Sequence, residues 1–525
     1  MNNYAQTAYK WLINFIHRHI YPISLILSFA LEAFVVQELT IPSLHNNITN
    51  ALATKLLRAL INLSFSTFLV SVFFGKCRVL LYIVSILEFI LSLVFLTYYG
   101  YFKVPITLTV IISQIHEFIK ISDVAIPLIS PTVFLMLTLS LLIKFFIISR
   151  LKNNNYKTNP FLILLSLIFL SFLIQISLQS TLQHNFLYVL DMDDRIPEAY
   201  GYLNAFTISG LNMLNNGQNF CLTTQKLYND RRNDTQLYAP IKPFKNIIVV
   251  QVESLDYSVL GMESNGKEVM PFLNSVTKSA IVKKIFSRHH GGSANSDYQC
   301  LTGAESPKIY TYALHTKLDF SKFETLPRKF KKFKSVSYHG CTGSFFSRKI
   351  PYTKMGFQET YFLEDFESIG FKGSKMGILD GDVFNFAIDR LNTSKNDHNF
   401  IFIITLTSHC DFDMTPSKNV YPEGEDDALW KKYINSINYV DQCFCKLYEK
   451  MPKDTVLVLY GDHWSYTDYD GVSMDEVPLV IFQKGNDIHN GIILKTTNDS
   501  IKLHDIHWII CDLMTKYSSP LEEPS

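Results

Sequence analysis

The chain has 525 residues, of which 48% are hydrophobic and 14% aromatic, so it is too apolar to be disordered and long enough for more than one domain. Its formal net charge is +1, from 48 basic and 47 acidic residues. This charge provides no overall basic field, and we expect no nucleic acid as a partner. Most of the excess of Leu, Ile and Phe lies before about residue 180, which excludes a simple cytosolic enzyme.

The N-terminal third contains five stretches that are apolar and long enough to cross a bilayer, which takes about 20 residues in a helix. The first stretch lacks a small-residue cleavage site and is followed by further spans, so we expect it to be retained. The sequence predicts a helical membrane domain over residues 1–177, with spans at 20–36, 56–75, 79–99, 124–143 and 160–177.

Basic residues that flank the spans predict the orientation of this domain, because Lys and Arg resist translocation. With the N-terminus inside, more of them fall on inner than on outer segments, and an odd number of spans exports everything after residue 177. The inner set is Lys10, Arg18, Lys76, Arg78, Lys144, Arg150, Lys152 and Lys157, and the outer set is Lys55, Arg58, Lys103 and Lys120.

Two carboxylates, Glu32 and Glu88, fall within spans, where a charge is costly. Two interpretations are open: an inward-facing pair or polar pathway, and protonated or interfacial carboxyls. Residues 102–121 mix apolar and polar positions, which predicts an interfacial helix on the outer face. Residues 178–242, with a Gly/Asn-rich stretch and a charged run, are predicted to form a connector.

From residue 243 onward, short buried strands alternate with helical patterns. Residues 246–252 (NIIVVQV), 400–406 (FIFIITL) and 455–460 (TVLVLY) are continuous apolar runs, typical of strands that are covered on both faces. They predict an exported α/β domain over residues 243–525 with a mostly parallel central sheet.

Residues suited to metal binding follow these three strands, where ligands of open α/β sheets collect. Glu253 follows the first run and His409 follows the second. Asp462 and His463 follow the third. One such residue after a strand is usually a cap or a surface residue, but three strand ends that deliver carboxylates and imidazoles to one edge predict a divalent metal site.

Residues 289–297 (HHGGSANSD) place two glycines before Ser293, at the predicted start of a helix. A helix N-terminus favours a phosphate or a developing oxyanion. Ser293 is therefore the candidate nucleophile, and the alternative is that Ser293 or Asn295 is only the N-cap. In the fourth position of a metal site, the serine hydroxyl would be activated for attack on phosphorus, beside the candidate ligands Glu253, Asp462 and His463.

These residues resemble those of the alkaline phosphatase and sulfatase superfamily, and within it the membrane-anchored lipoteichoic acid synthase and phosphoglycerol transferase group. The resemblance covers essentially the whole chain. Its motifs are 252–254 (VES), 292–297 (GSANSD), 337–340 (SYHG) with Arg348, 407–409 (TSH), 461–463 (GDH) and 476–481 (EVPLVI).

The resemblance implies an exported domain of alkaline phosphatase/sulfatase-like fold. It implies a multi-pass protein of the bacterial inner membrane, with its catalytic domain on the periplasmic or extracellular side. It also implies one divalent cation, usually Mn²⁺ with Zn²⁺ or Mg²⁺ as alternatives, bound by Glu253, Ser293, Asp462 and His463.

Three residues match family positions that contact the phosphoglycerol group: His339, Arg348 and His409. An Arg clamps a phosphate oxygen there, and a His stabilises or protonates a leaving oxygen. The chain departs from the family pattern at three positions, with Ser293 in place of a threonine, Cys341 in place of an acidic residue and Phe346 in place of a tryptophan.

The resemblance and the residues together predict metal-dependent transfer of a phosphoglycerol head group. The donor would be phosphatidylglycerol, the acceptor an envelope glycan or a polyglycerolphosphate chain, and the covalent intermediate would form on Ser293. Two alternatives are open: phosphoethanolamine transfer to lipopolysaccharide or another glycan, and a non-catalytic ectodomain that binds the envelope. The formylglycine motif of sulfatases is absent around Ser293, so sulfate-ester hydrolysis is not expected.

Seven of the eight cysteines fall in the exported part, where disulfides can form, but an odd number cannot all pair. We expect Cys443 and Cys445 to pack on a helix and Cys300 to lie in the core. Asp380 and Asp382 are predicted to form a turn followed by a helix cap.

Overall fold

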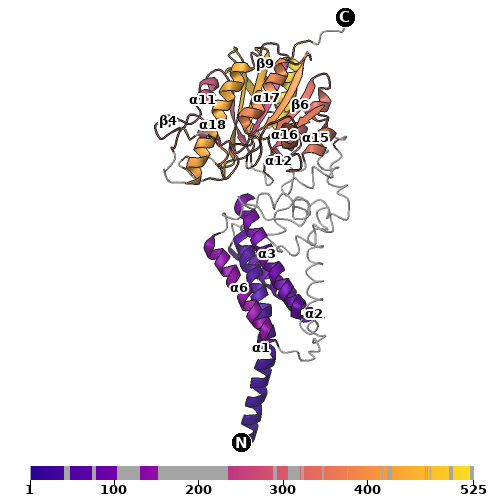
Figure 1. Ribbon diagram of the computed structural model, residues 1–525, viewed down its shortest axis with the longest axis vertical. Helices are drawn as coiled ribbons and strands as arrows, with labels where there is room; N and C mark the ends of the chain where they lie inside the picture. The colour runs from indigo at the N-terminus through magenta and orange to yellow at the C-terminus, as the bar shows by residue number, and fades with distance from the viewer. Residues whose placement is uncertain are drawn as a thin grey trace. The chain divides into compact units, whose positions relative to one another are not determined.

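The computed structural model contains two compact units, Met1–Asn216 and Gly217–Ser525 (Figure 1). The described part of the first unit is helical, and that of the second combines helices with a large sheet. The structure describes residues 2–40, 48–73, 78–102, 130–151, 235–287, 292–305, 320, 324–345, 348–374, 376–396, 398–416, 418–422, 428–467, 469, 471–472, 474–495 and 500–520.

Long helices form the described part of the first unit. Helix α1 packs against the other three, and Leu, Ile, Phe and Val side chains fill the core between them. Apolar residues also face outward, which suits helices in lipid, where each helix satisfies its own backbone hydrogen bonds. The bounds are α1 (Asn2–Thr40), α2 (Ile48–Phe73), α3 (Arg78–Phe102) and α6 (Pro131–Arg150).

Three described segments are long and apolar enough to cross a membrane: Ile20–Leu39, Arg78–Tyr98 and Pro131–Arg150. They overlap the first, third and fourth predicted spans, although α6 begins later than the predicted span. Helix α2 covers most of the second predicted span but is not among the three segments. The fifth predicted span and the interfacial helix predicted after residue 102 lie outside the described residues, so the count of five remains a prediction.

Lys144 is the centre of a buried ion cluster in the first unit. Its ammonium donates to Glu32 Oε2 at 2.5 Å and also to Glu88, and Ser140 donates to the Glu32 carboxylate. The prediction that Lys144 belongs to an inner flanking segment is therefore wrong, because α6 continues to Arg150 and the Lys144 side chain is only 1% exposed. The inward-facing interpretation of Glu32 and Glu88 is the one observed, since the lysine between them offsets part of their charge.

A seven-stranded sheet forms the centre of the second unit, with the strand order β5-β10-β9-β2-β8-β6-β7. The five strands from β9 to β7 are mutually parallel, and β10 is antiparallel to both of its neighbours. The prediction of a mostly parallel sheet is confirmed. The bounds are β5 (Ile281–Phe286), β10 (Glu476–Gln483), β9 (Thr455–Gly461), β2 (Asn246–Val252), β8 (Asn399–Ile404), β6 (Lys334–His339) and β7 (Glu359–Tyr361).

The three strands expected from the sequence are the central strands of this sheet. Strand β2 has the predicted bounds, β8 begins one residue earlier than predicted and ends at Ile404, and β9 extends to Gly461. Every residue of these strands is buried, which explains why their sequences are continuously apolar rather than alternating.

Helices cover both faces of the sheet (Figure 1). Ile401 and Ile403 of β8 pack into a cluster with side chains of α11 (Pro271–Thr277), α17 (Asp380–Asn392) and α18 (Leu429–Lys450). Phe402 points the other way, as alternation along a strand requires, and contacts Tyr352 of α15. The remaining bounds are β1 (Thr235–Tyr238), η2 (Tyr257–Val259), β3 (Glu263–Ser264), β4 (Lys267–Glu268), α12 (Ser293–Thr302), α14 (Leu326–Lys329), α15 (Lys349–Met355), α16 (Leu363–Ser368), β11 (Ile492–Lys495) and α19 (Asp505–Lys516).

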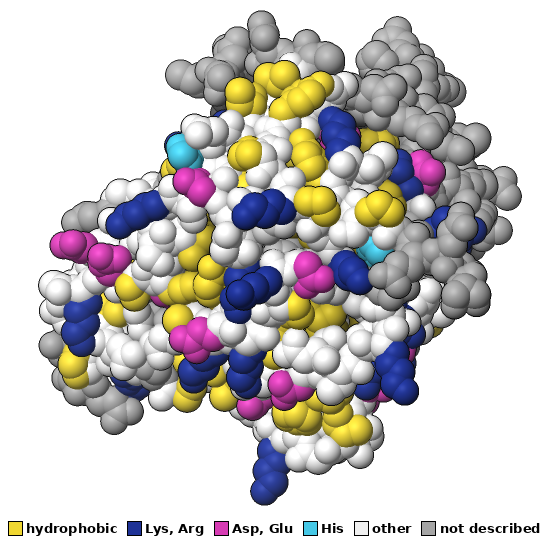
Figure 2. Space-filling model, turned by 90° about the horizontal axis from the view of Figure 1, so that it is seen from above, with side chains coloured by type: hydrophobic (Ala, Val, Ile, Leu, Met, Phe, Trp, Pro, Cys, Tyr) yellow, Lys and Arg dark blue, Asp and Glu magenta, His cyan; other side chains and the backbone are white. Residues whose placement is uncertain are grey.

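Charges of both signs share the surface drawn in Figure 2. Lys and Arg side chains are interspersed there with Asp and Glu, among apolar and uncharged groups. This mixture agrees with the near-zero net charge and differs from the basic stripe typical of nucleic-acid-binding proteins.

Burial of His507 in α19 predicts a pH dependence of stability. The His507 Nδ1 atom lies 3.2 Å from Cys300 O, and burial together with the charge of Lys329 lowers the pKa of His507 to about 3. An unfolded chain binds a proton at this imidazole near pH 6.5, whereas the folded chain does not. The free energy of unfolding should therefore decrease as the pH falls from about 6.5 towards 3, because protons then bind the unfolded chain preferentially.

Replacing His507 by Gln should reduce this slope, measured by chemical unfolding of the full chain between pH 7 and pH 5. The variant His489→Gln, which changes a half-exposed surface histidine, is the matched control. Equal slopes in the wild type and in His507→Gln would contradict the prediction.

Candidate active site

The candidate metal ligands meet at the carboxyl edge of the central strands. Strands β9 and β2 are neighbours, so the residues that follow them lie side by side. Glu253 follows β2, and Asp462 and His463 follow β9. Gly461 allows the two strand ends to approach, because a Cβ atom at this position would lie only 2.4 Å from Leu255 O.

The donor atoms of these three residues lie close together. One ligand atom of each lies within 4.8 Å of the others, and all three residues are buried. His463 Nε2 is 3.3 Å from Glu253 Oε1 and 3.7 Å from Asp462 Oδ2. Two carboxylates and an imidazole suit a borderline divalent metal ion, so the residues present fit the predicted group.

Hydrogen bonds around the donors orient them. The Nδ1 atom of His463 lies 2.8 Å from Trp464 O, a contact that favours a proton on Nδ1 and leaves Nε2 as the ligand atom. Asp462 Oδ1 accepts hydrogen bonds from His463 N at 2.7 Å and from Ser254 N at 2.8 Å. Ser254 adopts a φ of 55°, a region that non-glycine residues rarely occupy, and this places its amide on Asp462.

Ser293 is the first residue of α12 and points at the candidate metal ligands. Its Oγ donates to Glu253 Oε2 at 2.6 Å. The N-cap of α12 is Gly292, with a φ of 63°. The alternative that Ser293 or Asn295 is the N-cap is therefore wrong, and the Ser293 hydroxyl points into the site at the positive end of the helix dipole.

Buried polar side chains fix the position of α12. Gln251 Nε2 donates to Ser293 O at 2.9 Å, and Tyr460 Oη donates to Gln251 Oε1 at 2.7 Å. Ser296 Oγ donates to Asp462 O at 2.7 Å. Because an unpaired buried polar group is costly, these bonds favour one position of the helix and of the Ser293 hydroxyl.

The pKa values of Glu253, Asp462 and His463 depend strongly on the charges of the neighbouring residues. Burial raises the pKa of Asp462 to about 7, and the charge of Glu253 adds to this effect. Burial opposes protonation of His463, but the charges of Asp462 and Glu253 outweigh it and raise the pKa of His463 to about 10. Burial likewise opposes ionisation of Glu253, but the charges of His463 and His409 hold its pKa well below the usual range. A positive charge is thus favoured among these donors, which is the role a divalent cation would fill.

The three candidate substrate contacts form a second cluster beside the first. Arg348 Nη1 lies 3.3 Å from His339 Nε2, and the charges of Arg348, Glu253 and His409 all act on His339. Burial and the charge of Arg348 lower the pKa of His339 to about 3, so its imidazole is neutral at pH 7. The structure therefore brings all seven candidate residues into one region.

A model of the sulfatase family matches residues 245–499, which contain both clusters. The described α/β domain is therefore sulfatase-like over these residues. The α/β fold and the ligand positions at the strand ends agree with this assignment. The predicted resemblance to the lipoteichoic acid synthase and phosphoglycerol transferase group is confirmed by the relatives of this domain.

The chain is similar to curated proteins named lipoteichoic acid synthases. Lipoteichoic acid synthase 2 of Bacillus subtilis is 24% identical over 275 residues, which are 47% of this chain and 42% of that protein. Lipoteichoic acid synthase of Staphylococcus saprophyticus is 22% identical over 245 residues, which are 44% of this chain and 38% of that protein. The matches thus span less than half the length of either relative.

A solved structure, Streptococcus pyogenes phosphoglycerol transferase GacH in complex with sn-glycerol-1-phosphate, is also similar. It has a TM-score of 0.42 and 18% identity, and the match covers 58% of this chain and 82% of that chain.

Asp297 connects α12, the helix that begins at Ser293, to Arg348, and the sequence did not predict this contact. Its Oδ2 accepts hydrogen bonds from Arg348 Nε and from Tyr352 Oη, both at 2.7 Å, and all three residues are buried. The four-residue spacing of Ser293 and Asp297 indicated that both side chains lie on one face of α12, and so on the side of the candidate site. Asp297 thus holds the guanidinium in the site.

Replacing Asp297 by Asn should weaken activity and stability together. It leaves the buried guanidinium of Arg348 without its counter-charge, which costs about 3 to 5 kcal/mol of folding free energy. The control Glu359→Gln removes the partly exposed partner of Arg390, where we expect a loss below about 1 kcal/mol. The two variants are compared by chemical unfolding of the full chain, and equal losses would contradict the proposed role of Asp297.

Asp380 is the first residue of α17, whose N-cap is Leu379, so its predicted role as a cap is wrong. Its two carboxylate oxygens instead accept hydrogen bonds from Leu406 N at 2.7 Å and from Thr407 N at 2.9 Å. Asp380 thus orders the segment between β8 and His409.

The cysteine predictions concern helices of the sulfatase domain. Cys300 lies buried in α12, and Cys443 and Cys445 lie on α18, as predicted. The structure joins none of the described cysteines to one another by a disulfide. Phe346, one of the three departures from the family pattern, lies outside the described residues.

Proposed function

We propose that the chain transfers a phosphoglycerol head group from phosphatidylglycerol to a hydroxyl of an envelope glycan or a polyglycerolphosphate chain. The observation that carries the proposal is the Ser293 hydroxyl, held at a helix N-terminus 2.6 Å from a carboxylate of the candidate metal site. The buried Arg348 beside it offers a fixed positive charge for a phosphodiester. The curated relatives named lipoteichoic acid synthases support the same class of reaction.

In the first step, Ser293 Oγ attacks the phosphorus of the lipid phosphodiester. The Oγ–P bond forms and the bond from phosphorus to the diacylglycerol oxygen breaks. The Ser293 proton leaves through the hydrogen bond to Glu253 Oε2 and passes to water, while the Glu253 carboxylate stays ionised. His409 gives a proton to the leaving oxygen, and diacylglycerol departs.

In the second step, the acceptor hydroxyl attacks the phosphorus of the Ser293 adduct. The acceptor O–P bond forms, the Oγ–P bond breaks, and Ser293 regains a proton from water. The acceptor proton passes to His409, which restores the initial state. Arg348 holds a phosphoryl oxygen in both steps, and Asp297 keeps the guanidinium in place.

We propose that Glu253, Ser293, Asp462 and His463 hold one divalent metal ion, Mn²⁺. When bound, this ion would lower the pKa of the coordinated hydroxyl and stabilise negative charge at phosphorus. The chain is proposed to span the membrane five times, with the sulfatase domain on the outer side, where it reaches phospholipid head groups.

The test uses the full chain in proteoliposomes with Mn²⁺ and either phosphatidylglycerol or phosphatidylethanolamine. Diacylglycerol released from phosphatidylglycerol alone is the expected result. Release from phosphatidylethanolamine alone would show that the head group is phosphoethanolamine. Release from neither lipid with Mn²⁺, Zn²⁺ or Mg²⁺ would overturn the proposal in favour of a binding role.

A further inference from the structure

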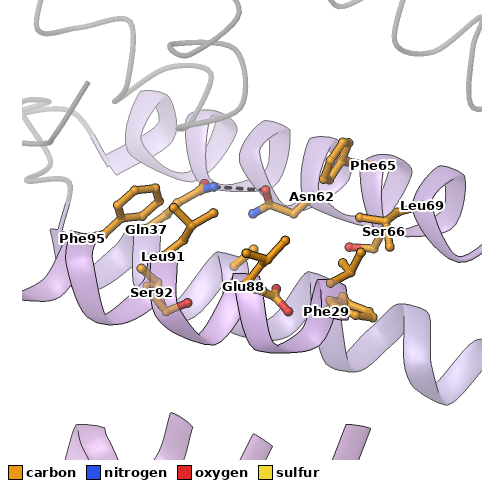
Figure 3. Close-up of a pocket in the computed structure, with 14 residues that line it drawn as sticks. Phe29, Gln37, Asn62, Phe65, Ser66, Leu69, Glu88, Leu91, Ser92 and Phe95 are labelled. Atoms are coloured by element: carbon orange, nitrogen blue, oxygen red, sulfur yellow. Dashed lines mark hydrogen bonds between the residues drawn. The ribbon is translucent and has the colours of Figure 1, made fainter. Parts of the chain in front are cut away.

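The helices of the first unit line an apolar cavity, partly open to its surroundings, that the proposed chemistry does not use. Its volume is about 310 Å³, within the range of ligand sites, and α1, α2 and α3 supply its walls (Figure 3). Its lining is overwhelmingly apolar, with phenylalanine rings from all three helices. Segments of α1 and α3 are long enough to cross a membrane, so the cavity belongs to the part of the chain in lipid.

Two amide side chains in this cavity have hydrogen-bonding atoms without a partner among the described residues. Gln37 Nε2 donates to Asn62 Oδ1 at 3.1 Å, which leaves Gln37 Oε1 and Asn62 Nδ2 unpaired (Figure 3). Both residues are buried, with 4% and 5% of their surfaces exposed, and both line the cavity. Unpaired amide atoms in an apolar site are costly, so a ligand with one hydrogen-bond donor and one acceptor would be stabilised there.

The depth of this amide pair agrees with the glycerol region of a lipid. Gln37 lies two residues before the end of the segment Ile20–Leu39, which is about 3 Å along a helix. The ester and hydroxyl groups of glycerolipids lie at that level of a bilayer, above their acyl chains. An acyl chain would extend from the amide pair along the apolar walls.

The charge of the lining selects against anionic head groups. Glu88 is the only ionisable residue that lines the described cavity, and its carboxylate is bonded to Lys144, which does not line it. A phosphodiester would find no positive charge there. A neutral lipid with a free hydroxyl offers a donor to Gln37 Oε1, and its ester carbonyl accepts from Asn62 Nδ2.

We propose that this cavity binds diacylglycerol, the neutral glycerolipid with one free hydroxyl next to an ester. The shape and lining of the cavity support this binding site by themselves. Its role as the place where the lipid product of the transfer leaves the enzyme rests on the proposed function.

The test is photo-crosslinking of a diacylglycerol with a diazirine on its acyl chain to the full chain in nanodiscs. The Ser293→Ala variant is used throughout, so that binding is measured without turnover. We expect labelling of peptides from α1, α2 or α3, and competition by unlabelled diacylglycerol but not by phosphatidylglycerol. The double variant Gln37→Leu/Asn62→Leu should lower the labelling about tenfold, as the loss of two hydrogen bonds implies.

Two further variants distinguish a loss of lipid binding from a loss of folding. Ala33→Leu fills part of the cavity while both amides are kept, and it should also reduce labelling. Ser64→Leu, on α2 but outside the lining, should label like the parent. Unchanged labelling of the double variant, or equal competition by phosphatidylglycerol, would overturn the inference. Labelling as expected, together with a wild-type chain that transfers no head group in the proteoliposome assay, would refute the proposed function and leave the lipid site standing.

Discussion

Replacing Ser293 by Ala should abolish head-group transfer, with a loss of at least about 10³-fold in the rate of diacylglycerol release. The reason is that Ser293 Oγ is the atom proposed to attack phosphorus, and it is held 2.6 Å from Glu253 Oε2. The rate is measured with the full chain in phosphatidylglycerol liposomes. The affinity for metal should fall less than the rate, because three protein ligands remain.

The matched control is Ser293→Thr, which keeps a hydroxyl at the same position. It should retain transfer well above the alanine variant, although the added methyl group must fit a buried position. An alanine variant that releases diacylglycerol at the wild-type rate would contradict the role of Ser293. So would an alanine variant and a threonine variant that are equally inactive while both are folded and metal-loaded.

Replacing Asp462 by Asn should lower the affinity for the divalent metal by at least about 100-fold and abolish transfer with it. Asp462 supplies one of three buried donor groups within 4.8 Å of one another, and an amide is a far weaker ligand than a carboxylate. The metal content of the full chain is measured after dialysis against defined Mn²⁺ concentrations. Transfer is measured on the same samples.

The matched control for this variant is Asp441→Asn. Asp441 is also a buried carboxylate, but it accepts hydrogen bonds from Phe272 N and Leu273 N at the start of α11, away from the candidate metal ligands. Asp441→Asn should lower the free energy of unfolding without changing the metal content. Normal metal content in Asp462→Asn, or an equal loss in Asp441→Asn, would show that Glu253, Asp462 and His463 do not form the metal site.

The central strands could be predicted from the sequence because both of their faces are buried. Their runs, such as NIIVVQV in β2, contain apolar residues at almost every position, a pattern that few other structures share. The cluster of Glu253, Asp462 and His463 was predictable for a related reason, since these residues follow such strands. The start of α12 was also indicated, because the glycines before Ser293 allow the positive φ that Gly292 adopts.

Long-range partners could not be predicted in the same way. Lys144 is 112 residues from Glu32 and 56 from Glu88, so no local pattern links their charges. Basic residues near the end of a span are normally assigned to a flank, and this rule placed Lys144 outside the helix bundle. Asp297 likewise meets Arg348 across 51 residues, and only the folded chain shows that the two form a pair.

Mass spectrometry of the full chain, after incubation with phosphatidylglycerol and Mn²⁺, is the direct test of the covalent intermediate on Ser293. We expect a phosphoglycerol adduct on the peptide that contains Ser293. This adduct should disappear when an acceptor is added and should never form in Ser293→Ala. Transfer of phosphoglycerol without an adduct on Ser293, or with an adduct on another residue, would contradict the account.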